Sequence, residues 1–260
     1  MINYNKVKEE AITFIRNFFS DAYNNKGAKA IIGISGGKDS TVAAALCAEA
    51  IGAENVIGVM MPCGHQADIA DSREVCSCLG ITNYTINIDC MFDALNTQLI
   101  GEGITTTEQM LINAKPRLRM TTLYAVAQSV GGRVCNNTNL SEFFVGYGTK
   151  FGDLAGDFAL FRYLPKTSVV EVGKLCTSIP CRLITKDPSD GLTGKTDEDK
   201  FGFTYEQLDK FLFTGQCDDK QVLEKIHQMH LRSIICQKSI PTHSVFLPSE
   251  ELTGHNTSVW

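Results

Sequence analysis

The residues best suited to chemistry form a short glycine-rich turn, Gly33–Ser40, with the sequence GISGGKDS. The turn follows an apolar run and precedes a helix-like pattern, so its backbone N–H groups and the helix N-terminus favour an anion such as phosphate. Asp39 conflicts with that assignment, because a carboxylate repels phosphate unless a cation lies between them. The turn therefore indicates a nucleotide polyphosphate held together with Mg²⁺, with Asp39 as a ligand of the metal.

Two familiar phosphate-binding motifs do not fit this turn. A P-loop needs Gly, four residues and then Gly-Lys-Ser/Thr, whereas Ile32 stands five residues before Gly37 and Asp39 follows Lys38. The dinucleotide fingerprint G-x-G-x-x-G is also absent. A simpler interpretation stays open, in which the glycines only make a tight connection and Asp39 occupies the first turn of a helix, where carboxylates are favourable.

The elements that must position this turn alternate between buried strands and helices. Short apolar runs predict buried strands over residues 28–35 and 55–62, and residues 83–88 and 132–137 are predicted as a third and a fourth strand. Helical spacing predicts helices over residues 7–19, 41–51, 68–79, 107–130, 205–213 and 218–238. The alternation predicts one α/β domain over residues 1–260, with a parallel sheet covered by helices on both faces. Polar turns at 35–40, 62–68 and 136–141 would then share the edge where such sheets bind ligands.

Composition and charge argue against several classes of protein. The chain has 260 residues and a net charge of −5 without a long basic run, so we expect no nucleic-acid partner. No apolar run reaches about 18 residues and no apolar segment follows Met1, so we expect no membrane span and no export. The ten cysteines lack zinc-finger spacing, and we expect reduced thiols that pack as small apolar groups in a cytoplasmic protein.

The segment SGGKDS at Ser35–Ser40 resembles the loop of the N-type ATP pyrophosphatases, which cleave ATP between its α and β phosphates. Three further segments resemble the NAD synthetases within that superfamily. They are NAKPRLRM at 113–120, NNTNLSEFFVGYGTKFGD at 136–153, and DPSDGL with TDEDKFGFTYEQLD at 187–209. The resemblance runs over residues 2–246. It implies an adenine nucleotide alpha hydrolase-like fold and the amidation of deamido-NAD by ammonia through an adenylated intermediate, with ATP as co-substrate.

The resemblance also implies roles for individual residues. It gives Asp39 and Lys166 catalytic roles, and it makes Asp39 and Glu142 the ligands of Mg²⁺. It implies contacts with ATP from Gly33, Ile34, Ser35, Gly36, Gly37, Lys38, Asp39, Ser40, Thr138, Lys166 and Ser189. It implies contacts with deamido-NAD from Arg117, Lys150, Asp157 and Lys238. Lys38 occupies a variable position of the loop, so we assign it no catalytic role. Without the resemblance, Lys150 and Lys166 would be interpreted as solvated lysines.

Two segments depart from the pattern of the family. GDLAGD at residues 152–157 stands where relatives commonly have GDGG-x-D, so the loop before Asp157 is bulkier. Gln237 and Lys238 stand where relatives often have His-Lys over the substrate. Both departures concern the contacts with deamido-NAD, whereas the residues assigned to ATP follow the family pattern, apart from Ser189 where relatives often have threonine.

The resemblance further implies a homodimer with deamido-NAD near its two-fold interface. The first predicted helix has a broad apolar face that could serve either the core or a partner. The 34 residues before Ser35 contain no cysteine, so we expect free ammonia, and not a glutaminase site, to supply the nitrogen. Two alternatives stay open. One is another adenylating member of the superfamily, such as a tRNA-thiolating or GMP-synthetase-type enzyme, and the other is a module that binds ATP without turnover.

Overall fold

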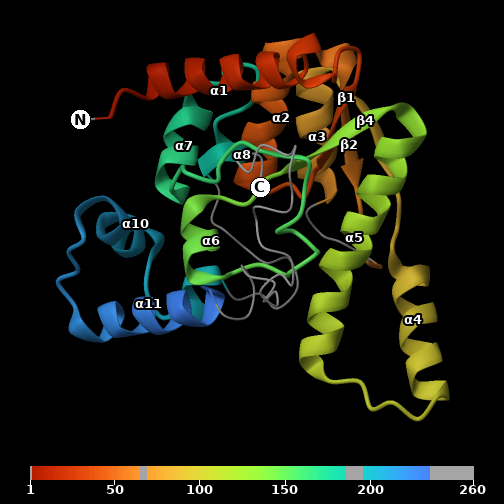
Figure 1. Ribbon diagram of the computed structural model, residues 1–260, viewed down its shortest axis with the longest axis vertical. Helices are drawn as coiled ribbons and strands as arrows, with labels where there is room; N and C mark the ends of the chain where they lie inside the picture. Colours follow the sequence, from red (N-terminus) through yellow and green to blue (C-terminus); the bar gives the residue numbers. More distant parts are fainter. Residues whose placement is uncertain (1, 65–68, 186–195, 235–260) are drawn as a thin grey trace, which may run out of the picture.

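The structure, a computed structural model, describes residues 2–64, 69–185 and 196–234. Its centre is a parallel sheet with the strand order β3-β2-β1-β4-β5 (Figure 1). The strands are β1 (Lys29–Gly33), β2 (Val56–Met60), β3 (Thr82–Thr85), β4 (Gly132–Asn136) and β5 (Phe158–Ala159). The first four confirm the predicted strands. The two residues of β5 are too few to leave a periodic pattern, and the sequence did not predict them.

Helices connect these strands and continue after the sheet. They are α1 (Tyr4–Phe18), α2 (Lys38–Ile51), α3 (Ile69–Leu79), α4 (Asp89–Gly101), α5 (Glu108–Val130), α6 (Leu140–Val145), α7 (Lys166–Lys174), α8 (Arg182–Thr185), α9 (Asp197–Phe201), α10 (Tyr205–Thr214) and α11 (Lys220–Ser233). The six predicted helices correspond to α1, α2, α3, α5, α10 and α11 within a few residues, although position 68 and the end predicted at 235–238 lie outside the described residues. The sequence did not predict α4, α6, α7, α8 and α9. In particular, α2 begins at Lys38, so the glycine-rich turn runs directly into its first turn.

Helices cover both faces of the sheet, as predicted. One face packs against α1, α2, α3, α7 and α8, and the other packs against α5 (Figure 1). Successive side chains of β1 point to opposite faces of the sheet, so the strand contributes to both cores. Ala30 and Ile32 lie in the first core, and Ile31 lies in the second. The apolar face of α1 serves the first core through Ile12 and Ile15.

Two parts of the chain lie outside this layered body. Helices α6, α9, α10 and α11 share a small third core that includes Tyr205 and Leu208. On the other side, α4 and the first half of α5 form a hairpin that projects away from the sheet (Figure 1), and none of the 13 residues of α4 is buried. Within the described ranges, no helix is both long and apolar enough to cross a membrane.

The cysteines follow the prediction in part. The nine within the described residues are all free thiols. Four of them, Cys47, Cys76, Cys135 and Cys176, are buried in the first core and pack as small apolar groups. Cys78, Cys90 and Cys181 are exposed instead, so the packing role does not extend to every cysteine.

Candidate active site

The glycine-rich turn lies at the carboxyl end of β1, the edge at which parallel sheets bind ligands. Gly36 has φ = 75°, a conformation that favours glycine. The Ser40 hydroxyl closes the turn, donating to the Gly37 carbonyl at 3.1 Å and accepting the Ser35 N–H at 3.3 Å. Gly37 caps α2 without a side-chain hydrogen bond. The turn therefore presents the N-terminus of a 14-residue helix to a bound anion.

Three charged side chains from three helices meet beside this turn. Asp39 comes from α2, Glu142 from α6 and Lys166 from α7. The Lys166 Nζ lies 2.5 Å from Asp39 Oδ2 and 2.9 Å from Glu142 Oε1. Lys166 is only 7% exposed, so its interpretation as a solvated lysine is wrong. The structure thus brings together the residues that the resemblance assigned to catalysis and to the metal.

The electrostatics of this cluster follow from burial and from the shared ammonium. Burial raises the pKa of Glu142 to about 7, with the Lys166 ammonium opposing the shift and the Asp39 carboxylate adding to it. Burial disfavours the charge of Lys166, but the two carboxylates outweigh that effect and raise its pKa above the ordinary value. With both carboxylates ionised, one lysine leaves a net negative charge, which favours the binding of a further cation.

Asn139 also belongs to the cluster, and the sequence analysis missed it. Its Oδ1 accepts the Glu142 N–H at 3.0 Å and so caps α6, while its Nδ2 donates to Asp39 Oδ1 at 3.2 Å. Asn139 directly precedes α6, in the segment TNLS at residues 138–141. Its second contact joins residues 100 positions apart, and no local pattern reports such a distance.

Tyr205 of α10 borders the cluster on its buried side and was likewise missed. Its ring centroid lies 5.3 Å from the Lys166 Nζ, and its hydroxyl donates to Asp197 at 3.2 Å. The other carboxylate oxygen of Asp197 accepts the Tyr147 hydroxyl at 2.8 Å. An aromatic face beside an ammonium stabilises the positive charge, so these residues favour a charged Lys166 in the cluster.

The remaining residues assigned to ATP lie partly outside the described structure. Thr138 follows β4 and is buried, and its hydroxyl donates to the Asp153 carbonyl at 2.9 Å. Its neighbour Asn137 donates to the Gly33 carbonyl at 3.3 Å, which joins the turn after β4 to the turn after β1. Ser189 lies outside the described residues, as does Lys238 from the group assigned to deamido-NAD.

A second group of predicted residues lies along α5, away from the cluster. The Arg117 Nε donates to the Lys150 carbonyl at 3.2 Å, and the Lys150 ammonium lies 5.5 Å from the Phe151 ring centroid. The structure therefore brings Arg117 and Lys150 together through the loop that follows α6. Gly152 permits this close packing, because a Cβ there would lie 2.9 Å from the Cβ of Pro116 in α5.

Asp157 already has partners for both carboxylate oxygens. Oδ2 accepts the Val134 N–H at 2.7 Å, and Oδ1 accepts the Tyr124 hydroxyl at 3.2 Å. These bonds tie α5 and the loop before β5 to β4. A contact between Asp157 and deamido-NAD stays a prediction, and it would have to form beside this structural role.

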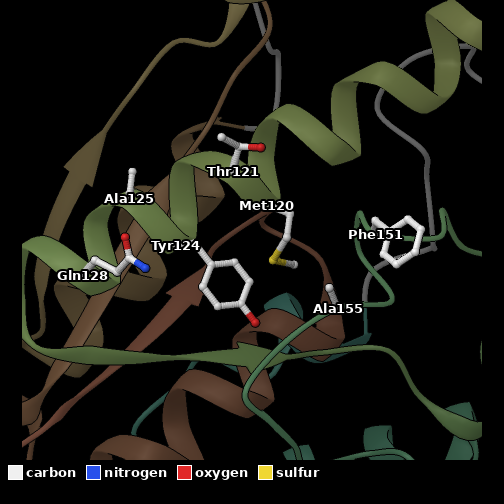
Figure 2. A pocket seen from close by; sticks show the side chains of 7 residues that line it. All are labelled: Met120, Thr121, Tyr124, Ala125, Gln128, Phe151 and Ala155. Atoms are coloured by element: carbon white, nitrogen blue, oxygen red, sulfur yellow. The ribbon is translucent and has the colours of Figure 1, made fainter.

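A hollow of about 530 Å³ opens between α5 and the loop that contains Phe151 and Ala155 (Figure 2). Tyr124, the partner of Asp157, stands in its wall, and Phe151 closes the far side. The residues that line it are mostly apolar: Met120, Thr121, Tyr124, Ala125, Gln128, Phe151 and Ala155. Its apolar walls and its position beside Arg117 suit a flat ring with a charged substituent.

Comparison with known proteins identifies the family of this chain. The family model described as NAD synthase matches residues 9–243. The chain belongs to the NAD synthase family. Curated relatives include the NH(3)-dependent NAD(+) synthetases of Thermococcus kodakarensis, 42% identical, and Finegoldia magna, 40% identical. The matches cover 83% and 86% of this chain and 84% and 91% of those proteins.

Solved structures of the NAD synthase family confirm the predicted fold class. The structure of NMN synthetase from Francisella tularensis gives a TM-score of 0.85 at 32% identity and covers 94% of this chain and 100% of that one. The NH3-dependent NAD synthetase from Campylobacter jejuni gives a TM-score of 0.73 at 26% identity, with the same coverage. The parallel sheet with helices on both faces is thus the adenine nucleotide alpha hydrolase-like fold that the resemblance implied.

Proposed function

We propose that this member of the NAD synthase family is a ligase that amidates deamido-NAD with ammonia at the expense of ATP. The observation that carries the proposal is the cluster of Asp39, Glu142 and Lys166 at the N-terminus of α2. Attack of a carboxylate on a phosphate brings like charges together, and enzymes stabilise such transition states with fixed positive groups. Lys166 and the backbone N–H groups of the turn are groups of this kind.

The reaction needs no nucleophile from the protein. A carboxylate oxygen of the nicotinate attacks the α phosphorus, the bond to the β phosphate breaks, and pyrophosphate departs with its bonding electrons. Ammonia then attacks the acyl carbon of the adenylate, AMP leaves, and the nitrogen loses a proton. The turn and Lys166 would hold the phosphates, and holding both reactants in line supplies much of the catalysis.

The residues present fit a magnesium ion. Asp39 Oδ2 and Glu142 Oε1 both reach one cationic atom, the Lys166 Nζ, so they can also reach a common metal. Among the described residues, no group of three or more histidine, cysteine or acidic side chains could hold a metal by itself. Mg²⁺ commonly takes one or two carboxylates and completes its shell with water and substrate phosphates. When bound, it would neutralise charge on the phosphate oxygens.

We assign deamido-NAD to the α5 side of the site. Arg117 and Lys150 supply positive charge there, and the hollow in Figure 2 supplies apolar walls. Free ammonia is the proposed nitrogen donor, supported by the names of the curated relatives, which match this chain over most of their length. The free thiols of exposed cysteines such as Cys78 fit a reducing compartment, the cytoplasm.

A homodimer is part of the proposal. The hairpin of α4 and α5 exposes large apolar side chains on a surface that no other described element covers: Met91, Leu95, Ile100, Ile104 and Ile112. Large exposed apolar side chains gathered on one projecting element favour a protein interface, and we propose that a second copy of the hairpin buries them. Such an interface would bring another chain close to the hollow along α5.

A second candidate function is the amidation of a pyridine mononucleotide. It is favoured by the TM-score of 0.85 with a structure named as an NMN synthetase, against 0.73 with a named NAD synthetase. The reacting carboxylate would be the same in both reactions. The difference lies in whether the site also holds the adenylate half of a dinucleotide.

One assay separates these functions. The purified chain is given ATP, Mg²⁺ and ammonium chloride with either deamido-NAD or nicotinate mononucleotide, and the amide product, AMP and pyrophosphate are measured. We expect a higher kcat/KM for deamido-NAD. A higher value for the mononucleotide would establish the second candidate, and failure to form AMP with either substrate would leave a module that binds ATP. Glutamine free of ammonia serves as the control for the nitrogen donor.

A further inference from the structure

Asp209 on α10 is a buried carboxylate to which the proposed reaction gives no role. It is 2% exposed. Its Oδ2 accepts the Thr167 N–H at 2.8 Å, and its Oδ1 accepts the Ser141 hydroxyl. The Ser141 oxygen in turn accepts the Lys166 N–H at 2.9 Å. These bonds form a closed ring that joins α6, α7 and α10.

The ring replaces the cap that α7 lacks. Lys166 is the first residue of α7, and Pro165 before it makes no side-chain cap. The first N–H groups of a helix need acceptors from elsewhere, and here Ser141 and Asp209 provide them for Lys166 and Thr167. A carboxylate at this end also interacts favourably with the helix dipole. The start of α7 is therefore fixed by residues from two other helices.

The same ring fixes the second member of the charged cluster. Ser141 directly precedes Glu142 in α6, so a bond at Ser141 constrains the backbone that carries the Glu142 carboxylate. Tyr205, one turn before Asp209 on α10, lies with its ring 5.3 Å from the Lys166 Nζ. Helix α10 thus contacts Lys166 at its ammonium through Tyr205, and it constrains the Lys166 main chain through Asp209 and Ser141.

We propose that Asp209 is a positioning residue that holds Lys166 and Glu142 at their working separation and so sets the affinity for ATP with Mg²⁺. Hydrogen bonds to an ionised carboxylate are stronger than neutral ones, and a small displacement of a charged group in such a site lowers turnover steeply. The proposal rests on the proposed function for the identity of the ligand, and its geometric part stands on the ring alone.

The test compares Asp209→Ala and Asp209→Asn with the unmodified chain by calorimetry of MgATP binding and by steady-state kinetics. Asp209→Ala should weaken MgATP binding by about tenfold or more, as expected for the loss of hydrogen bonds to a charged group. It should lower kcat/KM by ~100-fold. The KM for deamido-NAD should change little, because the ring is made by Ser141, Lys166, Thr167 and Asp209, whereas the residues assigned to deamido-NAD lie on the α5 side of the site. Asp209→Asn should lose less, since its one carbonyl oxygen can still accept the Thr167 N–H.

Leu208→Ala is the matched control. Leu208 adjoins Asp209 on α10 and is fully buried in the third core, so its truncation destabilises the same helix by leaving a cavity. At a temperature where this variant is folded, MgATP affinity should stay close to that of the unmodified chain. Equal weakening of MgATP binding by Leu208→Ala and Asp209→Ala would overturn the proposal. It would mean that Asp209 acts only through the packing of α10, as Leu208 does.

Further outcomes also decide the proposal. A folded Asp209→Ala variant with unchanged MgATP affinity, or with equal increases in both KM values, overturns the proposal. If Asp209→Ala does not fold, Ser141→Ala removes the same ring from its other side and should also weaken MgATP binding, and unchanged affinity in that variant overturns the proposal. If the unmodified chain binds MgATP but amidates no pyridine nucleotide, the proposed function is wrong. The change in MgATP affinity caused by Asp209→Ala would still test the role of Asp209.

Discussion

The two halves of the candidate active site differ in how completely one chain builds them. In the half assigned to ATP, Asp39, Glu142 and Lys166 are largely buried and contact one another across three helices. In the half assigned to deamido-NAD, Arg117 is exposed, and Asp157 has both oxygens engaged within its own chain. The first half is thus held together by contacts within one chain, whereas the second is an open surface beside an apolar hollow.

This difference indicates where each half obtains its specificity. Phosphate and Mg²⁺ are small and highly charged, and they are stabilised most by groups that need no rearrangement. A dinucleotide is large, and much of its binding energy comes from surface that can be contributed by other segments or by a second copy. We therefore expect changes in the ATP half to affect chemistry, and changes along α5 to affect binding and assembly.

The largest effect is expected from Lys166→Ala. The substitution removes the ammonium and leaves Asp39 and Glu142 facing each other, so kcat/KM should fall by ~10³-fold, the upper range for loss of one electrostatic group. Steady-state kinetics at saturating ammonium measures it. Lys174→Ala is the control, since Lys174 lies on the same helix and pairs with Glu171 at the surface. A decrease of less than tenfold in the kcat/KM of Lys166→Ala would show that the buried cluster has a structural role only.

Asp39→Asn comes next in the ATP half. The amide keeps the shape of the carboxylate but loses the charge that would hold a metal, so turnover should fall by at least ~100-fold. A titration with Mg²⁺ should also show a higher concentration for half-maximal rate. Asp21→Asn, on an exposed turn where the carboxylate pairs with Lys26, is the control. Near-normal turnover of Asp39→Asn at saturating Mg²⁺ would remove the metal-ligand role.

Asp157→Ala tests the other half of the site. The KM for deamido-NAD should rise by about tenfold while the KM for ATP stays the same, the pattern of lost substrate binding. The variant should also lose about 1–3 kcal/mol of stability, because the buried Val134 N–H loses its acceptor. Tyr124→Phe removes only the bond to Oδ1 and leaves the Val134 N–H paired, so it serves as the control for stability and should lose less. Equal changes in both KM values would mean that the loop as a whole has collapsed.

The smallest effect on chemistry is expected from Leu95→Glu on the hairpin. A charge in the proposed interface should weaken the dimer by at least ~30-fold, as expected for a central contact residue. Light scattering measures the association state, and kinetics should show a raised KM for deamido-NAD with the ATP half unaffected. An unmodified chain that is fully active as a monomer under assay conditions would remove the dimer from the proposal.

Local patterns were sufficient for the fold and for part of the site. The strands β1, β2 and β4 have short buried runs, and the helices α1, α2, α3 and α5 have helical spacing, so both can be read without tertiary information. The four residues of β3 are all exposed, although its position was predicted. By contrast, α4 has no buried residue, so no core face marked it as a helix. The glycine-rich turn was found because its special backbone conformation requires glycine at Gly36.

The sequence by itself determined the parallel sheet and the glycine-rich turn and, through its resemblance to a family, singled out Asp39, Glu142 and Lys166 as candidates. Only the tertiary structure decided that Lys166 is buried, that Asn139 reaches Asp39, and that Asp209 caps α7 from another helix. The physical reason is range: propensity and periodicity act over a few residues, whereas these contacts join positions from 42 to 127 residues apart. Whether a charged side chain is solvated or buried depends on which helices pack around it, and that is settled when the helices meet.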